Sequence, residues 1–289
     1  RVQGVYTGTF GPTVVKAAIN GSTIPVTVSG QYMKSGSIRR MELTLGTALE
    51  GKCRFGDREL AVRIVDGDNN MKPGNPWQKR AFGKNVAIVP GDTILVDLGD
   101  GSLTKDVRKA CYGSPIEVGG KWYQIAASAD GKQVAATAVQ IAGGKLRVDH
   151  PAWSAMLMGD KFVLPLDGDT QLVSVPAGEY ELRSYAESSA PNAAGQRASL
   201  GVAIVPGPGA KVTVEAGKTT ELAIGSPINA KVRVSKNGQD IIFTLVLTDA
   251  GGRPITSLTT YGGQTPPKPT IIITDAAGKQ VYQNSLEYG

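Results

Sequence analysis

Residues 13–28 decide the fold: Thr13-Val14-Val15-Lys16-Ala17-Ala18-Ile19 is followed by Asn20-Gly21 and then, after two residues, by Ile24-Pro25-Val26-Thr27-Val28. Both flanking runs are rich in β-branched residues, which favour strands. Asn-Gly between two such runs is the strongest short-range signal of a β-hairpin, because both residues tolerate the positive φ angles that a tight turn requires. The stretch therefore predicts two antiparallel strands.

Similar runs fill the rest of the first half. Alternation of apolar and polar residues predicts that 39–45 continues the sheet, and Gly119-Gly120 predicts a second hairpin between 115–118 and 121–125. Further strands are expected at 60–65 and 93–96, each ending in an Asp-rich turn. The polar stretch from about Asp66 to Pro90 predicts a long loop, and loops of that length in compact domains usually serve a function.

The second half repeats this pattern of short runs and turns. Strands are expected at 161–166, 171–175 and 180–185, as a pair at 212–214 and 221–224, and at 230–234, 241–247, 271–273 and 280–282. No fixed-period repeat is present, which argues against a solenoid or a propeller. Strands at such spacing, with turn residues between them, are typical of β-sandwiches.

The predicted fold class is all-β and multi-domain, with β-sandwich modules after an N-terminal antiparallel β domain. A chain of 289 residues has room for two or three domains. The pattern resets near Val148 and again after Gly225-Ser226-Pro227. We therefore expect an N-terminal domain at 1–148, a sandwich module at 149–226 and a C-terminal module at 227–289.

Two turn-and-strand motifs carry a resemblance to known modules. Val175-Pro176-Ala177-Gly178-Glu179-Tyr180-Glu181-Leu182 and Ile273-Thr274-Asp275-Ala276-Ala277-Gly278-Lys279 resemble β-sandwich modules of exported bacterial proteins, of the carboxypeptidase-regulatory-like (prealbumin-like) or immunoglobulin-like kind. The resemblance implies a sandwich fold and a periplasmic or extracellular location. It implies no reaction, because such modules are typically accessory or adhesive. The start at Arg1, without Met, fits a signal peptide that has been removed.

Composition and charge exclude some classes of function. The formal net charge is +6, but the basic residues are scattered and none alternates with aromatic residues as in a single-strand binding surface. We therefore expect no nucleic-acid partner. No run approaches the ~20 apolar residues of a transmembrane helix, so no such segment is expected.

The acidic turns are the candidate metal ligands. Asp66, Asp68 and Asn70 alternate as at the start of a Ca²⁺-binding loop, which gathers oxygen ligands on one cation. Met71 stands where the loop needs Gly, and Trp77 where it needs an acid, so a complete loop of the EF-hand kind is rejected. A looser Ca²⁺ site remains open if Asp97 and Asp100 lie beside Asp66 and Asp68. The alternative is that these residues only form turns. No other cofactor is expected.

Two cysteines and three tryptophans give further candidates. Cys53 and Cys111 either form a disulfide, which we favour, or are two buried thiols. Two cysteines and one histidine are too few for a structural zinc site. Trp77, in the polar stretch, is the candidate for contact with a sugar ligand.

Catalytic side chains are nearly absent. His150 is the one histidine, Asp149 and Ser154 are its sequence neighbours, and no Gly-x-Ser-x-Gly motif is present. We therefore expect a non-enzymatic exported protein with a binding or cell-envelope structural role, whose partner is a cell-surface polysaccharide or another envelope protein. The alternative is a hydrolase or a Ca²⁺-dependent carbohydrate-binding protein that uses the acidic loops.

Overall fold

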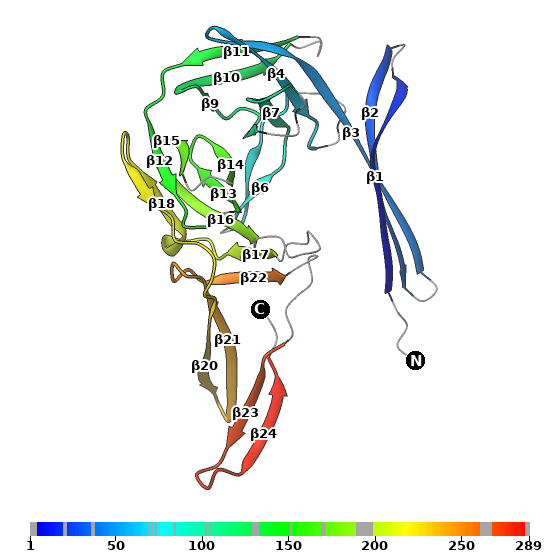
Figure 1. Cartoon of the computed structure of the whole chain (residues 1–289). Helices are drawn as coiled ribbons and strands as arrows, with labels where there is room; N and C mark the ends of the chain where they lie inside the picture. The colour runs from blue at the N-terminus through cyan, green and yellow to red at the C-terminus, as the bar shows by residue number, and fades with distance from the viewer. Residues whose placement is uncertain are drawn as a thin grey trace. The chain divides into compact units, whose positions relative to one another are not determined.

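A computed structural model describes residues 5–19, 22–35, 38–68, 70, 72, 74–83, 85–101, 103, 106–128, 133–150, 152–168, 172–188, 199–260 and 268–286. Within these residues the chain is almost entirely β-strand and contains no α-helix (Figure 1). The described part therefore also has no helix with the length and apolar character needed to span a bilayer. The all-β, sandwich-like fold class is confirmed.

The chain divides into two compact units, residues 1–140 and residues 141–289. This division differs from the three domains expected from the sequence. Strand β12 (Gly143–Arg147) pairs with β15 (Leu172–Pro176), across the expected boundary at 148. Strand β22 (Ile255–Thr260) pairs with β17 (Ser199–Ile204), across the expected boundary at 226. Turn residues mark where strands end, but long-range pairing decides which strands share a unit.

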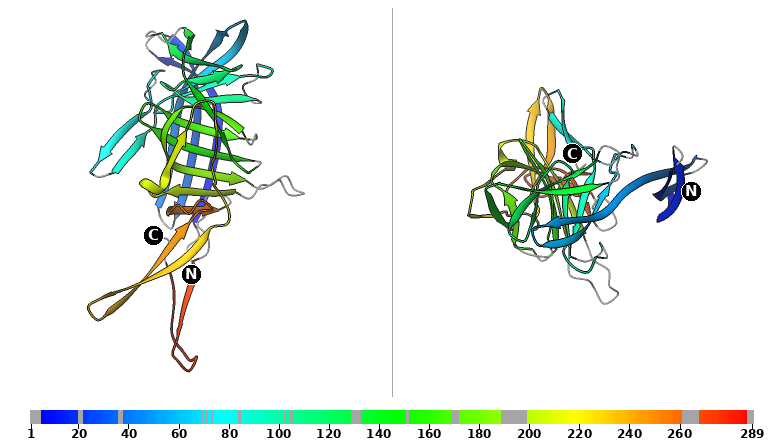
Figure 2. Two further views of the ribbon diagram at one scale, coloured as in Figure 1. Left: turned by 90° about the vertical axis from the view of Figure 1, so that its left-hand side faces the viewer. Right: turned by 90° about the horizontal axis from the view of Figure 1, so that it is seen from above.

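Among its described residues the first unit contains eleven strands. Their colours run from blue to green in Figures 1 and 2. They are β1 (Val5–Ile19), β2 (Ser22–Ser35), β3 (Ile38–Phe55), β4 (Arg58–Val65), β5 (Gln78–Phe82), β6 (Asn85–Val89), β7 (Thr93–Asp97), β8 (Val107–Cys111), β9 (Ile116–Val118), β10 (Lys121–Ala127) and β11 (Val134–Val139). They form a six-stranded sheet in the order β1-β2-β3-β4-β7-β8, a three-stranded sheet β11-β10-β9 and the ribbon β5-β6.

Both predicted hairpins of this unit are confirmed. Ile19 pairs with Ser22, which closes the hairpin of β1 and β2, although Asn20 and Gly21 themselves lie outside the described residues. Lys121 pairs with Val118 across the Gly119-Gly120 turn. One expectation was wrong: the stretch from Asp66 to Pro90 is not a loop throughout, because β5 and β6 form a hairpin within it.

The core of the first unit lies between its two larger sheets. Strands β4 and β7 alternate buried and partly exposed residues, so one face of each lies inward. The side chains of Phe55 and Tyr123 meet edge to face, with ring centroids 4.9 Å apart. The buried cluster consists of Cys53, Phe55, Leu60, Val62, Ile64, Ile94, Val96, Ala110, Ile116, Val118, Tyr123 and Ile125.

The second unit is a sandwich with two appended ribbons. Its remaining strands are β13 (Trp153–Gly159), β14 (Val163–Gly168), β16 (Gly178–Ser188), β18 (Lys211–Val214), β19 (Thr219–Glu221), β20 (Asn229–Asn237), β21 (Asp240–Thr248), β23 (Thr270–Thr274) and β24 (Gln280–Ser285), with one 3-10 turn at Pro208–Ala210. The sheets are β15-β12-β19, β14-β13-β16-β17-β22 with β18 also on β16, and the ribbons β20-β21 and β23-β24.

The core of this unit contains residues from both larger sheets. Leu146, Leu157, Val175 and Leu182 have no or almost no exposed surface. The expected pairing of 212–214 with 221–224 was wrong: β18 pairs with β16, while β19 pairs in parallel with β12. The tight turn between them suggested a hairpin, but the two strands belong to opposite layers of the sandwich.

Candidate functional site

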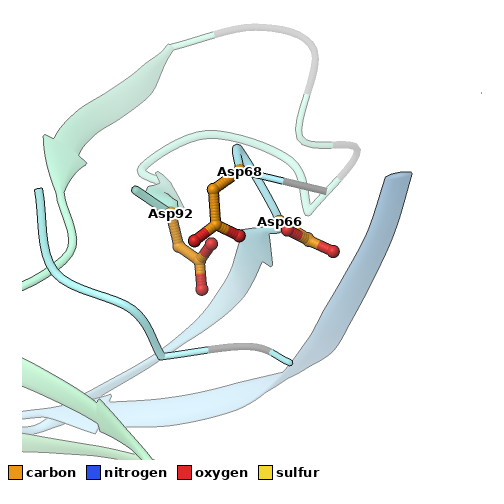
Figure 3. Close-up of side chains that lie close together, drawn as sticks. All are labelled: Asp66, Asp68 and Asp92. Carbon is orange, nitrogen blue, oxygen red and sulfur yellow. The ribbon is translucent and has the colours of Figure 1, made fainter. Parts of the chain in front are cut away.

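The candidate site is a group of three carboxylates in the first unit (Figure 3). Asp66 follows β4, Asp68 lies two residues later, and Asp92 precedes β7. One carboxylate oxygen from each residue lies within 4.8 Å of the others. Asp66 and Asp92 are buried, whereas Asp68 is exposed. We call these three residues the acidic cluster.

Antiparallel pairing explains why these three residues meet. Val65, the last residue of β4, pairs with Thr93, the first residue of β7. The residue after β4 must therefore lie beside the residue before β7. Asp97, which the sequence left open as a partner of Asp66 and Asp68, lies at the far end of β7 and is not part of this group.

Asp92 was missed from the sequence. Its side chain has no exposed surface and accepts hydrogen bonds from three backbone N–H groups: Oδ1 from Gly67 at 3.2 Å, and Oδ2 from Gly74 at 2.5 Å and Asn75 at 3.0 Å. Its own backbone carbonyl accepts from the Trp77 indole N–H at 2.9 Å. The one signal in the sequence was that Asp92 follows Pro90 and Gly91 directly before an expected strand. Only the pairing of β4 with β7 shows that Asp92 lies beside the loop after β4.

The glycines around Asp92 allow the backbone segments to approach one another. A Cβ on Gly67 would collide with the carbonyl oxygen of Gly91, and a Cβ on Gly91 would lie 2.5 Å from the carbonyl oxygen of Asn75. Three segments, at 67, 74–76 and 91, therefore pack backbone against backbone around one carboxylate. This geometry makes Asp92 a structural anchor for the loop.

The other two acids are also engaged in hydrogen bonds. Asp66 accepts from the Thr47 hydroxyl and the Asn70 backbone N–H, each at 3.2 Å. Asp68 accepts from the backbone N–H of Asn70 at 3.3 Å and from its side-chain amide at 2.9 Å. Desolvation raises the pKa of Asp68, and the hydrogen bond with Asp66 and the charges of Asp92 and Asp66 raise it further. Asp68 therefore takes up a proton more readily than an isolated aspartate does.

Asp97 and Asp100 form a separate turn. Asp97 is buried and accepts from the backbone N–H of Gly99 at 2.7 Å and of Leu103 at 2.5 Å. Leu103 has a positive φ of 56°, an unfavourable conformation for a branched side chain, and this hydrogen bond helps to hold it. Asp97 therefore stabilises a turn, which is the alternative to a Ca²⁺ ligand that the sequence left open.

Trp77 is partly buried, and its indole N–H is engaged with the backbone of Asp92. The sequence singled out this residue as an exposed contact for a sugar. The structure leaves one part of the ring accessible but fixes its polar edge inside the loop.

The two cysteines are free thiols, so the favoured disulfide is absent. Cys53 lies on β3 and Cys111 on β8, and β4 and β7 stand between them in the sheet. Three strand spacings of about 4.8 Å exceed the Cα separation that a disulfide can bridge. Burial raises the pKa of Cys53 and raises that of Cys111 to about 12, so both remain protonated at neutral pH.

Among the described residues, the contacts of His150 differ from those of a catalytic triad. Its Nε2 lies 3.7 Å from Glu187, and Glu187 accepts from the Ser226 hydroxyl at 2.8 Å. The carboxylate therefore stands between the histidine and the serine, whereas a serine nucleophile needs the histidine as its neighbour. The Nδ1 atom of His150 is engaged with the backbone of Ala152 at 2.9 Å.

We compared the chain with protein-family models, curated proteins and solved structures, and found no match to it in any of the three. The site must therefore be interpreted from its own geometry.

Removal of metal ions should leave the protein unchanged. All six carboxylate oxygens of the acidic cluster already accept at least one hydrogen bond, and Ca²⁺ needs six to eight oxygen ligands. We expect the same thermal midpoint with EDTA and with millimolar Ca²⁺, measured by differential scanning fluorimetry. A rise of several degrees on Ca²⁺ addition, lost in Asp68→Asn, would contradict this expectation.

Proposed function

We propose that this chain is a non-enzymatic exported protein with a binding or structural role in the cell envelope. The observation that carries the proposal is the ribbon of β20 and β21. Every residue of β20 is exposed, and the ribbon carries exposed Val232, Val234, Ile241 and Ile242. An isolated two-stranded ribbon is marginally stable in water. Contiguous exposed apolar residues in such an element are typical of surfaces that contact other macromolecules.

The polar groups of the molecule support the same proposal. The acidic cluster holds loop backbone in place, and the described contacts of the histidine are with Glu187 and the backbone of Ala152. Catalysis by paired carboxylates or a triad needs groups that are free to exchange protons with a substrate. The polar groups described above are committed to structural hydrogen bonds instead.

One contact favours the resemblance to immunoglobulin-like modules. The Tyr180 hydroxyl is buried and donates to the carbonyl oxygen of Pro176, four residues upstream, at 2.8 Å. Burial raises the pKa of Tyr180 to about 12, so the hydroxyl keeps its proton. A tyrosine that bonds back to the upstream backbone at a strand corner is a feature of that sandwich class. We therefore infer an exported, adhesive module with a periplasmic or extracellular location.

The second candidate function is Ca²⁺-dependent carbohydrate binding. The convergence of three carboxylates favours it, because hard oxygen ligands suit Ca²⁺. It predicts that binding to an envelope polysaccharide requires the cation. The structural role predicts binding that does not depend on it.

Co-sedimentation with isolated peptidoglycan sacculi and with outer-membrane fragments tests the proposal. We expect the protein to pellet with at least one fraction, equally well with EDTA and with Ca²⁺. Val234→Asp should reduce pelleting several-fold, because it places a charge on the exposed apolar face, while Asp57→Asn should not. Loss of pelleting in EDTA would support the second candidate, and no pelleting with either fraction would contradict the proposal.

An enzymatic assay provides the complementary test. We expect no turnover of chromogenic esters, glycosides or phosphoesters by the purified protein. Turnover that is lost in Asp68→Asn, an exposed position that should leave the fold intact, would overturn the proposal in favour of a hydrolase.

A further inference from the structure

The ribbon of β20 and β21 has one apolar face. Residues that pair directly across an antiparallel ladder point to the same face. The pairs Ala230 with Leu247, Val232 with Leu245 and Val234 with Phe243 place six apolar side chains on one side. Val234 and Ile241, which are 59% and 61% exposed to solvent, lie on this face toward the tip of the ribbon.

The two edges of the ribbon differ in charge. Strand β20 carries Lys231, Arg233 and Lys236, whereas β21 has no charged residue from Ile241 to Thr248. Cations on an edge strand oppose pairing with another strand. A β-rich, uncharged segment without Pro or Gly favours it. Among the described residues, no third strand extends this ribbon on either side.

We propose that β21 pairs in antiparallel fashion with β21 of a second copy of this chain. Pairing through β20 would set the three cations of each copy against those of the other, which is destabilising. Pairing through β21 brings together uncharged edges and leaves both cationic strands outermost. The resulting four-stranded sheet ends in charge on both sides, so assembly stops at a dimer instead of growing into a fibre.

The open part of the edge sets the geometry of this pairing. Thr248 already forms a bridge with Pro254, and a groove of about 260 Å³ between the end of β21 and β22 is lined by Leu247, Ile255 and Leu258. The segment from Ile241 to Thr244 lies beyond both the bridge and the groove, because the lining of the groove on β21 begins at Leu245. We centre the pairing on Phe243. Phe243 then pairs with Phe243 of the second copy, and Ile241 pairs with Leu245 of the second copy. The two-fold axis then runs perpendicular to the sheet, so both apolar faces lie on the same side.

This inference uses the same ribbon as the proposed function, but its test is separate, because dimerisation can be measured without any envelope fraction. The test is sedimentation velocity of the full chain over a hundredfold range of concentration. We expect the mass of one chain at low concentration and twice that mass at high concentration. A monomer throughout, an association that continues beyond the dimer, or an association only with a different protein would overturn the proposal.

Two matched variants locate the interface. Ile242 and Ser235 pair with each other across the ribbon, so Ile242→Lys and Ser235→Lys add the same charge at the same level and on the same face. We expect Ile242→Lys to weaken dimerisation about tenfold or more, and Ser235→Lys to leave it nearly unchanged. Ile272→Lys on β23 controls for exposed isoleucine elsewhere and should have no effect. Equal effects of the two ribbon variants would contradict pairing through β21, and circular dichroism would verify that both variants are folded.

Discussion

Replacement of Asp92 with alanine should lower the free energy of unfolding by about 3–5 kcal/mol, because it removes a fully buried carboxylate and leaves three partly buried backbone N–H groups without their acceptor. Asp92→Asn keeps one acceptor oxygen and should lower it by about 2 kcal/mol. The measurement is urea unfolding followed by tryptophan fluorescence, which reports on the nearby Trp77.

The control for Asp92 is Asp57→Asn, an exposed turn position in the same unit. It should change the free energy of unfolding by less than about 0.5 kcal/mol. If Asp92→Ala were equally mild, Asp92 would not be the anchor of the loop. If its effect appeared only in the presence of Ca²⁺, the acidic cluster would be a metal site.

Arg253→Met should destabilise the second unit by about 3–5 kcal/mol, because it leaves the fully buried carboxylate of Asp249 without its cation. Arg253 Nη1 lies 2.8 Å from Asp249 Oδ2 and also donates to the carbonyl oxygen of Ala223 at 2.5 Å. The same side chain thus joins the 249–253 turn to the segment that follows β19. Thermal unfolding followed by circular dichroism would measure the loss.

The double variant Asp249→Asn with Arg253→Met separates charge burial from lost packing. It removes the uncompensated charge and should recover a large part of the stability that Arg253→Met loses. The exposed pair of Arg147 and Glu221, at 3.2 Å, is the control, and Arg147→Met should cost less than about 1 kcal/mol. No recovery in the double variant would mean that packing of the arginine, and not its charge, stabilises the turn.

Local patterns in the sequence predicted the strands and several of their connections. The Asn20-Gly21 signal predicted the hairpin of β1 and β2, and β-branched runs predicted β4, β7, β20 and β21. These features depend on neighbouring residues, so composition and turn chemistry are sufficient to find them. The short strands β5 and β6 were missed because each is only five residues long. Lys79 and Arg80 also make β5 resemble part of a polar loop.

Long-range pairing was the part that the sequence could not supply. Asp66 and Asp68 were predicted to be close together, but their partner is Asp92, which stands at the start of β7 and not at its end. The direction of β7 beside β4 decides this, and no local pattern encodes it. The same applies to Cys53 and Cys111, whose separation depends on the two strands between them.

We propose that the exposed edge of the β20-β21 ribbon, and not a chemical site, is the working surface of this molecule. Hydrogen exchange of the full chain at low and high protein concentration tests it most directly. We predict that amides from Ile241 to Leu245 exchange more slowly at high concentration, while those of β20 exchange at the same rate at both. Exchange that does not depend on concentration in β21, or that slows equally in both strands, would contradict the account.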